Sequence, residues 1–79
     1  MSAQDLLEVA AQRYQAHEAV AAQQALLEAY QQCVTRAARI ECTSAVRAIQ
    51  GMLPARLVTQ RIRWAITCER QAEMSQSHR

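Results

Sequence analysis

An all-α fold is predicted from three features of the sequence. The 79 residues contain one Gly and one Pro, Gly51 and Pro54, so most of the chain lacks the two residues that disfavour helices most strongly. Apolar residues recur at spacings of three and four, whereas β-branched residues are scattered and no alternation of period two persists. We therefore expect one small helical domain, residues 1–79, built as a helical hairpin or a three-helix bundle with a long first helix.

The first helix is expected over residues 3–40. Ser2 precedes it and can cap it through its hydroxyl, and Asp5 stands three residues further on, where a capping box places its second partner. Asp5 and Glu8 also lie near the positive end of the helix dipole, where acidic side chains stabilise a helix. The start of this helix is therefore better defined by the sequence than its end.

A break or bend is expected between residues 35 and 44. Helix-forming residues continue to residue 50, but one helix over 3–50 would be about 70 Å long, more than so short a chain can cover by itself. Thr43 or Ser44 can cap a short second helix over 44–50. The alternative, a single unbroken helix, remains open from the sequence.

The segment "IQGMLPAR" is the strongest turn signal in the chain. Gly51 suits the left-handed position that follows many helices, and Pro54 suits the first turn of the next helix. The sequence therefore predicts a turn at Gly51–Pro54, a last helix over 54–72 and a frayed tail over 73–79.

The segment "AVAAQQALLEAYQQC", residues 19–33, is a good helix former with Glu28 as its one charged residue. It has an apolar stripe, and its other faces are neutral instead of charged. Ala and Gln tolerate partial burial, so we expect this helix to be covered on two sides, once by its own chain and once by another protein. The alternative is that Ala and Gln are simply helix formers on a wet surface.

Two seams are expected to anchor a partner by helix-in-groove packing. The Ala-rich segment from Ala10 to Ala25 would allow close approach of helices. The anchors of the first seam are Val20, Leu27, Tyr30 and Val34, and those of the second are Leu57, Ile62, Trp64 and Ala65. The sequence thus favours a small protein that works by protein–protein contact or self-association: an oligomeric subunit, a co-chaperone or an inhibitor.

An Arg-rich, nucleic-acid-binding or transcription-regulatory protein is the alternative. Residues 1–34 carry one Arg and four acids (1 − 4 = −3), and residues 35–79 carry eight Arg and three Glu (8 − 3 = +5). The candidate phosphate contacts are Arg47, Arg56, Arg61 and Arg63. A helix-turn-helix centred on Gly51 would place Arg47 and Gln60 where a small and an aliphatic residue are expected, so that motif fits poorly.

No metal site, cofactor, small-molecule substrate or catalytic centre is expected. His17, His78, Cys33, Cys42 and Cys68 are the only soft ligands, and they show no CxxC or HxxxH spacing. Nine residues turn a helix by about 900°, so the first two thiols would point to opposite sides of an unbroken helix. Three cysteines without a secretory signal or an apolar membrane-spanning segment predict free thiols in a cytoplasmic protein.

Overall fold

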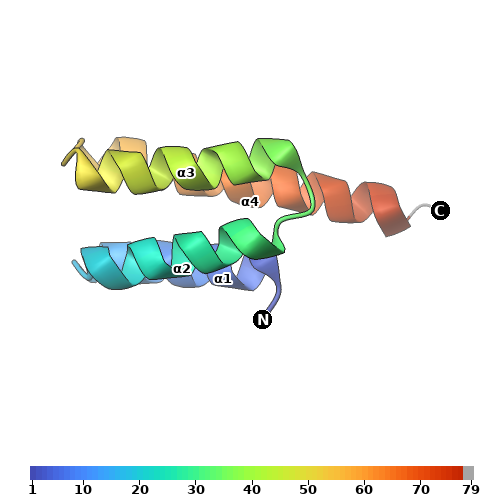
Figure 1. Ribbon diagram of the computed structural model, residues 1–79, viewed down its shortest axis with the longest axis horizontal. Helices are drawn as coiled ribbons and strands as arrows, with labels where there is room; N and C mark the ends of the chain where they lie inside the picture. Colours follow the sequence, from blue (N-terminus) through green and yellow to red (C-terminus); the bar gives the residue numbers. More distant parts are fainter. Residues whose placement is uncertain (78–79) are drawn as a thin grey trace.

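The computed structural model describes residues 1–77, and in that part the chain forms four α-helices and no strand. Successive helices run antiparallel (Figure 1). Contacts between α1 and α2, α2 and α3, α3 and α4, and α4 and α1 close a ring around one core. The all-α prediction is confirmed, but residues 1–77 form four helices and not the two or three expected. Their bounds are α1 (Ala3–Gln15), α2 (Ala19–Gln32), α3 (Arg36–Gln50) and α4 (Ala55–Ser77).

The expected long first helix is wrong, because the chain turns back after α1. Ser2 caps α1 as predicted, with the reciprocal capping box to Asp5. The helix then ends in a Schellman motif: His17 N–H donates to the Tyr14 carbonyl, and Glu18 N–H donates to the Arg13 carbonyl at 2.9 Å. His17 takes the left-handed conformation, with φ 64°.

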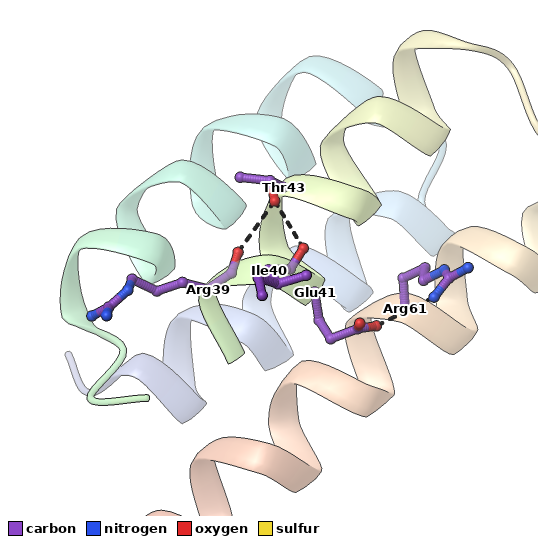
Figure 2. Close-up of polar contacts among 5 residues, drawn as sticks. All are labelled: Arg39, Ile40, Glu41, Thr43 and Arg61. Carbon is purple, nitrogen blue, oxygen red and sulfur yellow. Dashed lines mark hydrogen bonds and ion pairs between the residues drawn. The ribbon is translucent and has the colours of Figure 1, made fainter. Parts of the chain in front are cut away.

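The second break falls at residues 33–35, so it overlaps the predicted range of 35–44 only at residue 35. Thr35 is the cap of α3, and its hydroxyl accepts from the Ala38 N–H at 3.1 Å. Neither Thr43 nor Ser44 begins a helix, because α3 continues through both. The Thr43 hydroxyl instead donates to the Ile40 carbonyl one turn earlier, as Figure 2 shows.

The turn between α3 and α4 is confirmed, with its left-handed residue one position later than expected. Gly51 is the last residue of the helical path, with φ −80°, and Met52 takes φ 56°. A second Schellman motif results, in which Met52 N–H donates to the Ile49 carbonyl and Leu53 N–H to the Ala48 carbonyl. Gly51 is suited to its place because a Cβ there would lie 3.2 Å from the Arg47 carbonyl oxygen.

The last helix is longer than predicted. It begins directly after Pro54, whose carbonyl accepts from the Leu57 N–H, and it continues to Ser77 instead of ending near residue 72. Figure 1 shows its C-terminal part extending beyond the other three helices. Glu73 in that part accepts a hydrogen bond from Gln4 of α1. Of the expected frayed tail, residues 78–79, with His78, lie outside the described residues.

The core of the bundle consists mostly of small side chains. Leu7, Leu26, Ile62 and Val58 are its large, fully buried aliphatic residues, and alanines from all four helices fill most of the remainder. Alanine allows close helix approach but buries little apolar area, at about 25 cal/mol per Å². Each large core residue therefore carries a large share of the packing energy.

Candidate interaction surface

Helix α2 has one buried and one exposed face, and both carry apolar side chains. One face is fully buried and contains Ala22, Leu26 and Ala29. The opposite face exposes Val20 and Leu27 to 69% and 53%, and their seven-residue spacing keeps the two side chains on one line of the helix. Val34, which is 51% exposed, lies beyond the end of α2, in the connection to α3. We call these three residues the α2 seam.

The side chains flanking the α2 seam are largely uncharged. Gln24 and Gln31 are exposed beside it, and Tyr30, 39% exposed, lies on the side of α3. Glu28 is exposed on the other side, where it lines a hollow with Leu6 of α1. The expectation that this helix has a charge-free outer face therefore describes a real surface of the bundle.

A buried carboxylate fixes the C-terminal end of the seam. Glu69 of α4 is 1% exposed, and its two oxygens accept from the Val34 N–H at 3.0 and 3.2 Å. Arg39 donates from Nη1 to the Cys33 carbonyl at 3.2 Å. The short connection between α2 and α3 is thus held by one side chain from each of α3 and α4, so Val34 has a defined position.

A hollow with mixed polar and apolar lining joins the outer sides of α2 and α3. Tyr30 shares a hollow with Ile40, which is 49% exposed, and the same hollow is bordered by Arg36 and Arg39. In Figure 2, Arg39 reaches toward α2 whereas Glu41 points toward α4. Ile40 therefore lies on the outer side of α3, between the two neighbouring helices.

Of the four candidate residues of the second seam, all on α4, two are exposed and two are buried in the core. Leu57 and Trp64 are exposed to 36% and 44%, and Trp64 borders a groove with Ile40 of α3. Ile62 and Ala65 are fully buried in the bundle and are not available to a partner. All four candidates of the first seam, Val20, Leu27, Tyr30 and Val34, are thus exposed, whereas only two of the four α4 candidates are.

The four Arg candidates for phosphate contact do not form one cluster. Arg47 is exposed in the last turn of α3, and Arg56 and Arg63 border a hollow on the exposed side of α4. Arg61 is directed toward α3, where its Nη1 lies 3.6 Å from the Glu41 Oε2 (Figure 2). Its guanidinium carbon lies 4.9 Å from the centre of the Trp64 ring. These two contacts restrain Arg61 within the bundle.

Two thiols lie side by side in the core, contrary to the expectation that they point apart. The Sγ atoms of Cys33 and Cys42 are 4.0 Å apart, because the break at 33–35 folds α3 back along α2. Burial raises the pKa of both thiols, and the neighbouring Glu69 carboxyl raises that of Cys33 further. Cys68 is half-buried, and all three cysteines are free. The buried pair is thus kept in the uncharged thiol form.

The unfolding free energy is expected to fall as the pH rises above 9. An unfolded cysteine ionises near its ordinary pKa of 9.0, whereas the raised pKa of Cys42 keeps its thiol protonated in the folded chain. Below that pH both states hold the proton and the contribution is intact; above it the unfolded state loses the proton first and is favoured. Urea unfolding from neutral pH to about pH 11 measures the decline. Cys42→Ala should flatten it, and an equal slope in both proteins would contradict the assignment.

Sequence reasoning missed Glu69 and Ile40 as important positions. Glu69 continues the three- and four-residue spacing of the buried Val58, Ile62 and Ala65. An acidic residue on this apolar stripe is the sequence feature that indicates a buried carboxylate. The position of Ile40 beside Tyr30 follows only from the break at 33–35, which folds α3 back along α2.

Comparison with known proteins provides no relative for this chain. No protein-family model matches it, and neither a curated protein nor a solved structure does. Among the described residues, no helix is long and apolar enough to cross a membrane, and no group of three or more His, Cys, Asp or Glu side chains is placed to hold a metal ion.

Proposed function

We propose that this protein is a non-enzymatic protein-binding subunit that acts through the α2 seam and the adjoining surface of α3. The single observation that carries the proposal is the exposure of Val20 and Leu27 along one line of α2, with Val34 exposed just beyond its end, while the other face of the helix is buried. Exposed apolar side chains in a continuous patch are typical of protein interaction sites, whereas isolated ones are ordinary surface residues.

The internal polar groups support a binding role for the outside of the molecule. The Glu69 oxygens are occupied by the Val34 N–H, and the Cys33 and Cys42 thiols are buried against each other. A reactive cysteine is an exposed thiolate, which is the opposite of this pair. These side chains therefore serve the architecture that positions the seam.

Nucleic-acid binding is the weaker candidate. The basic character of α3 and α4 supports it, since Arg56 and Arg63 are exposed on one hollow. Against it, Arg61 is directed toward Glu41, and α3 and α4 form an antiparallel hairpin (Figure 1) instead of the crossed pair of a helix-turn-helix.

A photoreactive benzophenone side chain in place of Leu27 tests the proposal in the cells that make the protein. Irradiation should join the chain to another polypeptide, which a gel and mass spectrometry identify. The same side chain in place of Arg63 is the control, because Arg63 is exposed on α4 and lines a hollow that no residue of the α2 seam borders. Equal labelling from both positions, or none from position 27, would count against the α2 seam.

A further inference from the structure

We propose that Cys33 and Cys42 are a site of reversible disulfide formation that joins the end of α2 to α3. Their Sγ atoms are 4.0 Å apart in the core, in contact with each other. A disulfide places its two sulfur atoms about 2.05 Å apart, so each has only about 1 Å to move. The inference goes beyond the proposed function, because it concerns the covalent state of the core and not the outer surface.

The fold restrains the backbone on both sides of this pair. Cys42 lies within α3, whose helical hydrogen bonds fix its position. Cys33 is the cap residue of α2, and its carbonyl accepts from Arg39 Nη1 at 3.2 Å. The Val34 N–H, in the same peptide group, donates to the Glu69 carboxylate at 3.0 and 3.2 Å. Two thiols held in contact have a high effective concentration, which favours the disulfide over the separate thiols.

A low-molecular-weight disulfide serves as the oxidant, by thiol–disulfide exchange. Cys33 reacts first because it borders the 33–35 connection, whereas Cys42 lies inside a helix. The Cys33 thiolate attacks one sulfur atom of the oxidant, breaks the oxidant's S–S bond and releases one thiolate. The Cys42 thiolate then attacks the Cys33 Sγ and releases the second. One S–S bond thus forms in the protein and one breaks in the oxidant, which takes up two electrons and two protons and leaves as two thiols.

The reaction is slow because the closed bundle keeps the oxidant away from the pair. Both thiols are buried, and burial together with the neighbouring Glu69 carboxyl raises the pKa of Cys33, so its thiolate is scarce. Local opening of the 33–35 connection exposes Cys33, and that opening breaks the hydrogen bonds between the Val34 N–H and Glu69. Glu69 therefore controls the rate at which the disulfide forms.

Peptide mapping of the purified full chain identifies the cysteines that react. The chain is incubated with oxidised glutathione in native buffer, its remaining thiols are alkylated, and it is digested with trypsin. Arg36 and Arg39 separate Cys33 from Cys42, and further arginines separate both from Cys68, so each cysteine lies on its own tryptic peptide. Mass spectrometry should find the peptides of Cys33 and Cys42 joined to each other. Cys68, which is half-buried and free, is the internal control and should be joined to neither.

The melting temperature of the oxidised chain is the second measurement. It should exceed that of the reduced chain by about 5 °C or more, because the link closes the segment 33–42 and restricts the unfolded chain. An equal or lower Tm overturns the inference. So does a link from Cys68 to either buried cysteine, or the recovery of both buried thiols alkylated after prolonged incubation.

Paired variants of Glu69 test the control of access. Glu69→Leu should speed formation of the link at least about fivefold, because the Val34 N–H loses its acceptor and the connection opens more often. Glu69→Gln is the matched control and should react at a rate closer to that of the original chain, since its amide oxygen can still accept from the Val34 N–H. Equal rates for Glu69→Leu and the original chain would contradict the role given to Glu69.

Discussion

Leu26→Ala is expected to lower the free energy of unfolding by about 2–5 kcal/mol, the usual range for removing a large aliphatic side chain from a core. Leu26 is fully buried on the inner face of α2, among alanines that have no side chain able to move into the space. In a domain of this size the change should reduce Tm by roughly 8 °C or more, which calorimetry measures.

Leu27→Ala is the matched control, since the two leucines are adjacent in α2 but Leu26 is buried and Leu27 is exposed. Leu27 is 53% exposed, so its truncation should change the stability of the dilute chain by less than about 0.5 kcal/mol. Equal losses at the two positions would show that the faces of α2 are assigned wrongly. Only Leu27→Ala should also weaken partner binding through the α2 seam.

Glu69→Leu is expected to reduce stability by about 1–3 kcal/mol, because it leaves the Val34 N–H without an acceptor. Hydrogen exchange at the Val34 amide should accelerate in this variant. Both effects follow from the same cause, since the carboxylate closes the connection between α2 and α3 from the side of α4.

Glu69→Gln is the comparison that separates hydrogen bonding from packing. Its amide oxygen can accept from the Val34 N–H, so most of the stability and the slow exchange should be retained. Buried charged groups can sometimes be replaced by apolar ones without loss. A Glu69→Leu protein as stable as the original chain would place Glu69 in that class and would remove its anchoring role.

The sequence predicts the helical class, the Ser2 cap and the turn before Pro54 because each depends on local chemistry. It does not predict the number of helices, since the break at 16–18 has no Gly or Pro, and the break at 33–35 is marked only by the Thr35 cap. His17 occupies a left-handed position that Gly most often fills. Met52 occupies another, although Gly51, directly before it, would be the expected residue for that conformation. Tertiary packing imposes these conformations on residues that do not favour them.

The part of the candidate surface that depends on local helix periodicity is predictable from the sequence, and the rest is not. Val20 and Leu27 share a line on any helix over residues 19–33, so the seven-residue spacing is sufficient to group them, whereas Val34 lies beyond the helix end. Assigning Ile62 to the core and Ile40 to the surface requires knowing which helices are neighbours. That depends on the two breaks, which no periodicity in this chain reveals.

The ring of antiparallel helices also determines how the chain can reach its folded state. Three of the four helix contacts join neighbours in the sequence, and only the contact of α1 with α4 brings distant segments together. Chains dominated by such local contacts fold in microseconds to milliseconds, because little loop entropy is lost before contacts form. Closing α4 onto α1, with Gln4 meeting Glu73, is the one step that must wait for the rest of the chain.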